Sequence, residues 1–444
     1  MAKPLVAIVG RPNVGKSTFF NRAVQKRVSI IEDIPGVTRD RIYADCEWQR
    51  YRFSMVDTGG IDMDSEDVLL KQMRAQVEIA VDTADVIVFM VDGRQGVTSA
   101  DADVADFLRR SKKPAVLAVN KVDSPRLNDQ TYDFYNLGMG EPIGISAQQG
   151  MGTGDLLDAI CAHLPRPDEE ETPDERIHIA IVGKPNAGKS SLVNALLGEN
   201  RVIVSDIPGT TRDAIDTDLM IDGQPYVLID TAGIRKKSRI EDASLERYSV
   251  MRSLGAVRRA DVVFIVLDAT AGVTEQDTKI AGYAHEEGKA CCLVVNKWDL
   301  IEKDTHTMNK FKQQLATDFS FMDYAPCLFI SAKTGQRVQK VLQTAQEIYS
   351  QSTRRITTGM LNDVLTEAIR MNEPPSDKGR RVRVYYGTQV SVQPPTFVLF
   401  VNNPELMHYS YTRYLENHLR KTFGFEGTPI RFILRARDGK KENG

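Results

Sequence analysis

Short apolar runs alternate with longer helical patterns along the chain, and this arrangement occurs twice. In the first half the runs are VAIV at 6–9, FSMVD at 53–57, VIVFMVD at 86–92 and AVLAVNK at 115–121. Their counterparts in the second half are IAIV at 179–182, YVLID at 226–230, VVFIVLD at 262–268 and CCLVVNK at 291–297. Near-continuous apolar strands separated by helices are typical of a parallel sheet covered on both faces. The pattern predicts two α/β domains with mainly parallel sheets, whose binding residues lie at the carboxyl ends of strands.

The last part of the chain has another pattern, which predicts a small α+β domain. We expect helices near 359–371 and 404–422, and strands at 381–386, 396–401 and 430–437. Such a sheet with a partly basic surface suits RNA backbone binding, although its Tyr and Phe residues are more typical of a core than of stacking platforms. Alternation along two strands places two sets of side chains each on one face: Arg381, Arg383 and Tyr385, and Arg431, Ile433, Arg435 and Arg437.

The length of 444 residues fits about three domains. We expect a first domain at 1–164, a linker at 165–175, a second domain at 176–351 and a third at 352–444. The linker PRPDEEETPDE is stiffened by proline and carries like charges, so it should be extended and exposed. No comparable stretch divides the second domain from the third, which favours closer docking there.

Charge is distributed unevenly along the chain. The net charge is −3, yet residues 354–444 hold 15 Lys and Arg against 9 Asp and Glu, an excess of six positive charges. Two interpretations account for this asymmetry. The third domain has a polyanionic partner, or it is a basic domain that docks on acidic ones within the chain.

Cysteine usage and hydropathy indicate the compartment. Five cysteines without CxxC spacing make a disulfide framework or a zinc site an unfavoured interpretation, and a reducing compartment fits. The run LVAIVG at 5–10 predicts a strand rather than a signal peptide, and the apolar runs are too short to span a bilayer. We therefore expect a soluble, cytoplasmic protein.

Two phosphate loops of the form GxxxxGK[ST] lie 173 residues apart, GRPNVGKST at 10–18 and GKPNAGKSS at 183–191. Glycines let backbone N–H groups surround phosphate oxygens, the lysine adds charge, and the hydroxyl after it binds magnesium. Two copies in register make a chance match negligible. The residues predicted to bind nucleotide here are Gly10, Asn13, Gly15, Lys16, Ser17 and Thr18, and Gly183, Asn186, Gly188, Lys189, Ser190 and Ser191.

Two further motifs repeat at the same offset, IPGVTRD at 34–40 with IPGTTRD at 207–213, and DTGG at 57–60 with DTAG at 230–233. An aspartate there holds magnesium, the glycine amide meets the terminal phosphate, and a loop threonine joins the metal only when that phosphate is present, which makes a switch. The residues assigned to terminal phosphate are Gly60 and Gly233, and the magnesium ligands are Ser17, Thr38 and Asp57, and Ser190, Thr211 and Asp230.

NKVD at 120–123 and NKWD at 296–299 predict which base is bound. A carboxylate accepts from the ring N–H and the exocyclic amine of guanine together, whereas adenine would leave a buried charge unpaired. SAQ at 146–148 and SAK at 331–333 supply loops whose backbone touches the guanine carbonyl. The predicted base-site residues are Asn120, Lys121, Asp123, Ser146 and Ala147, and Asn296, Lys297, Asp299, Ser331 and Ala332.

The paired motifs, together with RVRVYYGTQVSVQPPTFVLFVNNP at 381–404, resemble the Der or EngA family of bacterial tandem-domain GTPases over essentially the whole chain. The resemblance implies two tandem Ras-like P-loop GTPase domains and a C-terminal KH-like domain. It also implies GTP hydrolysis in assembly or maturation of the large ribosomal subunit, through nucleotide-dependent domain rearrangement. The expected partner is that subunit or its precursor, including ribosomal RNA, with neither DNA nor membrane, and the chain is expected to be a monomer.

The expected chemistry is phosphoryl transfer to water, with GTP and GDP as ligands and Mg²⁺ as cofactor. Ile61 and Ile234 follow DxxG, where no polar group can align water, so intrinsic hydrolysis should be slow. The resemblance implies K⁺ as an activating ion, held partly by Asn13 and Asn186, although a loop asparagine can also bond its own backbone. The residues assigned to catalysis are Lys16, Thr38 and Gly60, and Lys189, Thr211 and Gly233; Arg39 and Arg212 are either exposed loop charges or contributors to catalysis.

Some features leave alternatives open. RKKSR at 235–239 is a solvated loop or a nucleotide-dependent contact with RNA or another domain. The GxxG at 424–427 precedes a strand, whereas in RNA-binding KH domains GxxG joins two helices, so it is interpreted as a coincidental turn. An RNA-binding adaptor, whose nucleotide sites mainly lock domain arrangement, is the alternative function. A GTPase linked to RNA modification or membrane chemistry is less favoured, because the chain shows no further catalytic motif or lipidation signal.

Overall fold

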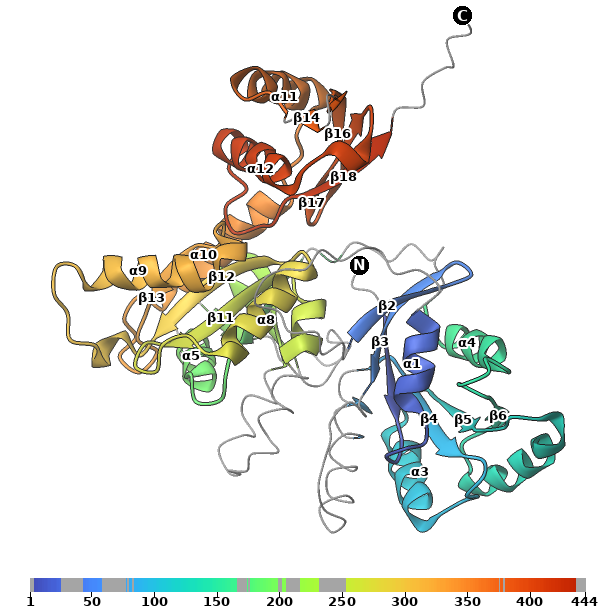
Figure 1. The fold of residues 1–444 in the computed structure, drawn as a ribbon. Helices are drawn as coiled ribbons and strands as arrows, with labels where there is room; N and C mark the ends of the chain where they lie inside the picture. The colour runs from blue at the N-terminus through green and yellow to red at the C-terminus, as the bar shows by residue number, and fades with distance from the viewer. Residues whose placement is uncertain are drawn as a thin grey trace, which may run out of the picture. The chain divides into compact units, whose positions relative to one another are not determined.

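The computed structural model describes residues 4–24, 43–57, 77, 80–81, 84–165, 174, 176–198, 202–204, 216–230, 253–374, 376–377 and 380–436. Two compact units make up the structure, the first within residues 1–174 and the second within 175–444, except that residues 253–255 group with the first. Figure 1 shows a sheet flanked by helices in the first unit. The second unit holds a seven-stranded sheet, a three-stranded sheet and the short pair β14-β15. None of the helices in the described ranges has the length and apolar character needed to cross a membrane.

The first unit contains a six-stranded sheet in the order β2-β3-β1-β4-β5-β6. Only β2 and β3 pair antiparallel; every other neighbouring pair is parallel. All seven residues of β4 are buried, as the continuous apolar run predicts for a strand covered on both faces. The strands are β1 (Leu5–Val9), β2 (Tyr43–Trp48), β3 (Tyr51–Asp57), β4 (Val86–Asp92), β5 (Ala115–Asn120) and β6 (Ile143–Gly144).

Helices cover both faces of this sheet, because successive strand residues point to opposite sides. Leu5, Ala7 and Val9 of β1 share a core with α3 and η1, whereas Val6 and Ile8 share the other core with α1 and α4. The helices are α1 (Lys16–Val24), α3 (Ser99–Ser111), the 3-10 helix η1 (Pro125–Leu137) and α4 (Thr153–Ala162).

The second unit repeats this design with one extra edge strand, in the order β13-β12-β11-β7-β10-β9-β8. The pairs β8–β9 and β9–β10 are antiparallel and the others parallel, so the predicted mainly parallel sheets are confirmed. The strands are β7 (Ile177–Val182), β8 (Val202–Val204), β9 (Thr217–Ile221), β10 (Gln224–Ile229), β11 (Val262–Asp268), β12 (Ala290–Asn296) and β13 (Cys327–Phe329).

Helices again lie on both faces of the second sheet. Leu192 of α5 and Val341 of α10 pack in one core, and Ile280 of α8 and Leu315 of α9 in the other. The helices are α5 (Lys189–Leu197), α8 (Glu275–Glu286), η3 (Trp298–Leu300), α9 (Thr307–Asp318), η4 (Ser320–Met322) and α10 (Gln339–Ser352).

The C-terminal part is α+β, as predicted, with a three-stranded sheet in the order β16-β17-β18. The pair β16–β17 is antiparallel and β17–β18 parallel. Leu365 of α11 and Leu415 of α12 bury Phe397 and Leu399 of β17, so both helices cover one face. The elements are α11 (Thr358–Met371), β14 (Ser376–Asp377), β15 (Arg380–Arg381), β16 (Val384–Val392), β17 (Pro395–Val401), η5 (Pro404–Leu406), α12 (Tyr409–Phe423) and β18 (Arg431–Ala436).

The prediction of one continuous strand at 381–386 was wrong. The strand is broken between β15 and β16, because the side-chain amide of Asn402 bonds the main chain there. It donates to the Arg381 carbonyl at 2.9 Å and accepts from the Arg383 N–H at 2.8 Å. Arg381, Arg383 and Tyr385 are nevertheless all exposed, as alternation predicts.

The predicted helix at 404–422 was also wrong in its first turn. Two separate caps divide the segment: Asn403 accepts from the Glu405 N–H to begin η5, and His408 accepts from the Ser410 N–H to begin α12. On β18 the exposed Arg431, Ile433 and Arg435 alternate with half-buried residues, which confirms the predicted face; Arg437 lies outside the described residues.

The turn at 424–427 docks the C-terminal part on the second sheet. The Cys291 N–H, at the amino end of β12, donates to the Gly427 carbonyl at 2.6 Å, and the Gly427 N–H donates to the Tyr324 carbonyl at 2.8 Å. Phe425 is fully buried, and its N–H donates to Gln351 Oε1 at 3.0 Å. The turn joins a helix to a strand, as the sequence predicts, and its bonds to the second sheet agree with the close docking expected there.

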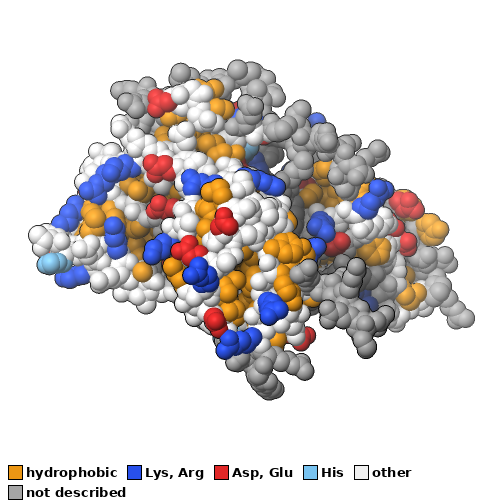
Figure 2. Space-filling model, turned by 90° about the horizontal axis from the view of Figure 1, so that it is seen from above, with side chains coloured by type: hydrophobic (Ala, Val, Ile, Leu, Met, Phe, Trp, Pro, Cys, Tyr) orange, Lys and Arg blue, Asp and Glu red, His pale blue; other side chains and the backbone are white. Residues whose placement is uncertain are grey.

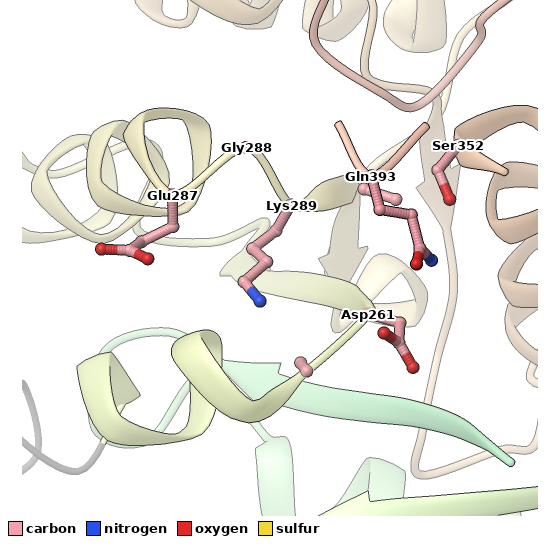
Figure 3. A pocket seen from close by; sticks show the side chains of 8 residues that line it. Asp261, Glu287, Gly288, Lys289, Ser352 and Gln393 are labelled. Carbon is pink, nitrogen blue, oxygen red and sulfur yellow. The ribbon is translucent and has the colours of Figure 1, made fainter. Parts of the chain in front are cut away.

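A pocket at this junction lies at the amino ends of β11 and β12 (Figure 3). Figure 3 shows Asp261 and Lys289 from the sheet side opposite Gln393 and Ser352. The Lys289 ammonium donates to the Arg258 carbonyl at 2.7 Å. The nucleotide motifs lie at the carboxyl ends of strands, so this pocket is separate from them.

Replacing Gly427 by Ala should destabilise the second unit. A Cβ on Gly427 would lie less than 3.0 Å from two carbon atoms of Ile348, and Gly427 has a φ of 75°. Gly223 has a φ of 84° but nothing within 4 Å, so Gly223→Ala carries the backbone cost without the clash. We expect Gly427→Ala to cost about 1–3 kcal/mol more than Gly223→Ala, the usual range for overpacking.

Urea unfolding measures this difference in a Trp48→Phe background, where the buried Trp298 is the remaining tryptophan of the two in the chain. Equal unfolding midpoints for the two alanine variants would contradict the packing of the docking turn.

Candidate functional site

The two phosphate loops have the same backbone shape. Gly10 has a φ of 150° and Gly183 a φ of 142°. A Cβ on either glycine would lie under 3.0 Å from a main-chain carbonyl of the neighbouring strand, that of Met90 in β4 or Val266 in β11. Only glycine therefore fits at these positions, and each loop is held against the end of the next strand.

Asn13 and Asn186 occupy equivalent left-handed positions, each with a φ of 62°. Asparagine tolerates this conformation better than most residues, so backbone geometry alone accounts for its presence.

Both loop lysines fold back onto their own loop. The Lys16 ammonium donates to the carbonyls of Gly10 at 2.8 Å and Arg11 at 2.6 Å. The Lys189 ammonium does the same with Gly183 and Lys184, at 2.7 Å each. Burial lowers the pKa of Lys16 to about 8, although the nearby Asp57 carboxylate opposes the shift. The first loop therefore holds a desolvated cation at its centre, whereas Lys189 in the second loop is half-buried.

Residues suited to magnesium come together at the first site. Ser17 is the second residue of α1 and donates from its hydroxyl to Asp57 Oδ2, at the end of β3, at 2.5 Å. Serine hydroxyl and carboxylate oxygens are ligands that Mg²⁺ prefers, so the residues present fit this ion.

At the second site Ser190 lies in the first turn of α5 and Asp230 directly follows β10. The Asp230 N–H donates to Asp216 Oδ1 at 3.0 Å, and Arg259 pairs with the other oxygen of Asp216. Asp216 and Arg259 thus position the backbone of a predicted metal ligand, which the sequence motifs did not indicate. Several predicted residues lie outside the described ranges: Thr38, Arg39, Gly60, Ile61, Thr211, Arg212, Gly233, Ile234 and the run 235–239.

A buried asparagine ties each phosphate loop to the base-site loop. Asn120 Nδ2 donates to the Val14 carbonyl at 2.7 Å, and its Oδ1 accepts from the Ala147 N–H at 2.9 Å. Asn296 repeats both bonds, with the Ala187 carbonyl at 2.9 Å and the Ala332 N–H at 3.0 Å. These asparagines were predicted to bind nucleotide; in the structure both ends of each amide join protein loops.

The lysines of NKxD also have protein partners. Lys121 pairs with Asp92 and Lys297 with Asp268, each at 2.6 Å between Nζ and Oδ2. The aspartates end β4 and β11, directly opposite Asn120 and Asn296 in the ladder. Motif reasoning missed both aspartates, although the aspartate closing each apolar run was a signal that could have found them.

The carboxylates predicted to read the base are held in their ionised form. The Ser146 hydroxyl donates to Asp123 Oδ1 at 2.6 Å, and this bond lowers the pKa of Asp123 below its ordinary value. A hydrogen bond from Ser331 likewise lowers the pKa of Asp299. The serines of SAQ and SAK thus orient a carboxylate, a role that the two letters alone did not reveal.

Each site therefore contains a phosphate loop with a lysine folded onto it, oxygen-bearing side chains suited to a metal, and a carboxylate whose pKa is lowered. Neutral pH keeps the Asp123 and Asp299 carboxylates fully charged, since their pKa values lie below the ordinary range. A carboxylate in that state accepts two N–H groups from guanine.

Removing the Asn120 amide should loosen the first site. In Asn120→Ala the Val14 carbonyl and the Ala147 N–H lose these buried bonds. Each unsatisfied group costs about 1–3 kcal/mol, and both loops lose their common support. We expect faster hydrogen exchange in β1 and β5 and weaker binding of GDP at the first site.

Asn21→Ala on the exposed face of α1 serves as the control, measured by hydrogen exchange mass spectrometry of the full chain. Exchange in β1 and β5 that matches this control would show that the amide does not support the loops.

Comparison with known families agrees with this organisation. The family described as 50S ribosome-binding GTPase matches residues 5–121 and 178–297. The KH-domain-like family of EngA bacterial GTPase enzymes, C-terminal, matches residues 355–435. The Elongation factor Tu GTP binding domain family matches residues 246–351.

Curated relatives match from end to end. GTPase Der of Alkaliphilus metalliredigens is 59% identical over 440 residues, covering 99% of this chain and 100% of the relative. GTPase Der of Ruminiclostridium cellulolyticum is 59% identical over 446 residues and covers 100% of both. GTPase Der of Listeria monocytogenes is 57% identical over 437 residues, covering 98% of this chain and 100% of the relative. Because the likeness includes both nucleotide-binding domains and the C-terminal KH-like domain, the chain belongs to the GTPase Der family and is a GTPase.

Proposed function

We propose that the chain is a cytoplasmic GTPase that binds the large ribosomal subunit or its precursor, including ribosomal RNA, in a GTP-dependent manner and acts in its assembly. The observation that carries the proposal is the match of both nucleotide-binding domains to a family described as 50S ribosome-binding GTPase. Two similarly built sites in one chain allow nucleotide state to control domain arrangement. The proposal includes neither DNA nor a membrane as a partner. We also propose that the chain is a monomer.

In this proposal the residues of each site divide the work of phosphoryl transfer. The Lys16 ammonium exchanges its carbonyl partners for oxygens of the terminal phosphates, and Lys189 does so in the second site. Ser17 and Asp57, with Thr38, hold magnesium, as do Ser190, Asp230 and Thr211. When bound, this ion supplies positive charge beside the phosphates. Gly60 and Gly233 donate their amides to the terminal phosphate.

Base selection rests on Asp123 and Asp299, with each carboxylate receiving the ring N–H and amine of guanine. The desolvated lysine and preorganised donors favour charge that develops in the transition state. Ile61 and Ile234 leave no polar side chain after DxxG to orient water. We therefore include potassium as an activating ion, bound in part by Asn13 and Asn186, whose side chains project from exposed loop positions.

The domain limits remain part of the proposal: 1–164 and 176–351 for the nucleotide-binding domains, 165–175 for the linker and 352–444 for the KH-like domain. Each described sheet lies inside one of these ranges, and α10 crosses the limit at 351 by one residue. Most of the linker lies outside the described residues.

The positive charge of the KH-like domain serves two purposes in this proposal. Arg413 donates to the Ser320 carbonyl and Arg431 to the Glu286 carbonyl, so part of the charge docks the domain on its neighbour. Arg383 and Arg435 are exposed and suit an RNA backbone. Figure 2 shows Lys and Arg side chains lying among hydrophobic ones on the face seen there.

Co-sedimentation with purified large ribosomal subunits tests the proposed function. The full chain is loaded at both sites with GDP or with a non-hydrolysable GTP analogue. We expect the chain to pellet with the subunit only in the analogue-bound state, because nucleotide state is proposed to control its domain arrangement. Small subunits serve as the control. Absence of binding in both states would overturn the ribosomal assignment.

Potassium should accelerate GTP hydrolysis relative to sodium at equal ionic strength. Loss of one contact to a bound ion in Asn13→Ala or Asn186→Ala should reduce this acceleration at the corresponding site. Phosphate release by the full chain measures the effect, and the analogue affinity checks that the loop still binds nucleotide. Equal rates in the two salts would remove potassium from the mechanism.

A further inference from the structure

The two nucleotide sites differ at a side chain that follows β4 in one and β11 in the other. Arg94 lies two residues after β4, and Thr270 lies two residues after β11. The turns themselves agree: the Arg94 N–H donates to Asp92 Oδ1 at 2.9 Å, and the Thr270 N–H donates to Asp268 Oδ1 at 2.9 Å. The same backbone therefore presents an arginine in the first site and a threonine in the second.

Arg94 engages the carboxylate assigned to the base. Its Nη2 pairs with Asp123 Oδ2, while Oδ1 of the same carboxylate accepts from the Ser146 hydroxyl at 2.6 Å. Both oxygens of Asp123 thus have a protein partner. In the second site the Thr270 hydroxyl donates back to Asp268 at 2.6 Å and carries no charge.

Guanine needs both oxygens of this carboxylate, one for its ring N–H and one for its exocyclic amine. Serine can share its oxygen, because a carboxylate oxygen accepts more than one bond. A guanidinium on Oδ2 occupies the space and the lone pairs on the side where a second donor would approach. Guanine and Arg94 therefore compete for Oδ2.

We propose that Arg94 lowers nucleotide affinity at the first site by competing with guanine for Asp123, whereas Thr270 carries no charge with which to compete at the second site. The inference rests on the proposed role of Asp123 as the base-reading residue. Through this contact the first site binds nucleotide more weakly than it would without Arg94, and filling of the first site releases Arg94 from Asp123.

The size of the effect follows from the exposure of the pair. The Arg94 side chain is 62% exposed and that of Asp123 20%. Exposed ion pairs contribute little free energy. Because guanine must break the pair between Arg94 and Asp123, the presence of Arg94 should weaken guanine nucleotide binding about 1.5- to 5-fold. Salt screens such a pair, and the difference should shrink as ionic strength rises.

Equilibrium binding of ribose-labelled fluorescent GDP to the full chain tests this inference. Asp299→Asn disables guanine recognition at the second site, so the signal reports the first. In that background Arg94→Thr, which copies the second site, should tighten binding about 1.5- to 5-fold at low salt. Arg52→Thr removes the same charge from a pair with Glu47 on the β2–β3 hairpin and should leave the affinity unchanged.

The reciprocal variant gives a second readout. In an Asp123→Asn background, Thr270→Arg should weaken binding at the second site by a similar factor. An unchanged affinity in Arg94→Thr overturns the competition, and a weaker one shows that Arg94 contacts bound nucleotide instead. If Asp123→Asn itself leaves first-site GDP affinity intact, the base-reading assignment fails, which separates that error from failure of the Arg94 proposal.

Discussion

Each nucleotide site depends on one buried asparagine amide. Asn120 and Asn296 end β5 and β12, each next to an edge strand, and each amide joins the carbonyl of a phosphate-loop residue to the N–H of a base-loop residue. Phosphates and base are recognised by segments far apart in sequence, so their separation must be fixed by something that both touch. The amide does this with one donor and one acceptor, buried where water cannot compete for either.

Around this shared framework the two copies have diverged. In the first site Arg22 of α1 donates to the carbonyls of Ala147 and Gln148, and these bonds tie the base-site loop to α1. The equivalent residue of α5 is Ala195, which packs into the core instead. In the second site the ion pair of Asp216 with Arg259 supports the main chain of Asp230. The two copies therefore keep the same nucleotide motifs, but their charged side chains support different loops.

Much of the fold could be predicted from the sequence because its signals are local. Continuous apolar runs fix buried parallel strands, and glycine spacing fixes the two phosphate loops. What escaped prediction depends on contacts between distant residues. Asp92 and Asp268 lie outside any short motif, yet they face the NKxD asparagines across the ladder. The strand break at 382–383 arises from Asn402, about twenty residues further along the chain.

The docking turn at 424–427 attaches to the start of β12, and Asn296 ends the same strand. Cys291 and Asn296 are separated by five residue steps, or roughly 17 Å at about 3.3 Å for each step. A hydrogen-bonded strand in the middle of a sheet neither stretches nor bends over that distance. The KH-like domain and the second base-site loop thus contact opposite ends of the same rigid strand, β12. A displacement of β12 would move both of its ends together. The KH-like domain should therefore move with the second nucleotide-binding domain as one rigid body.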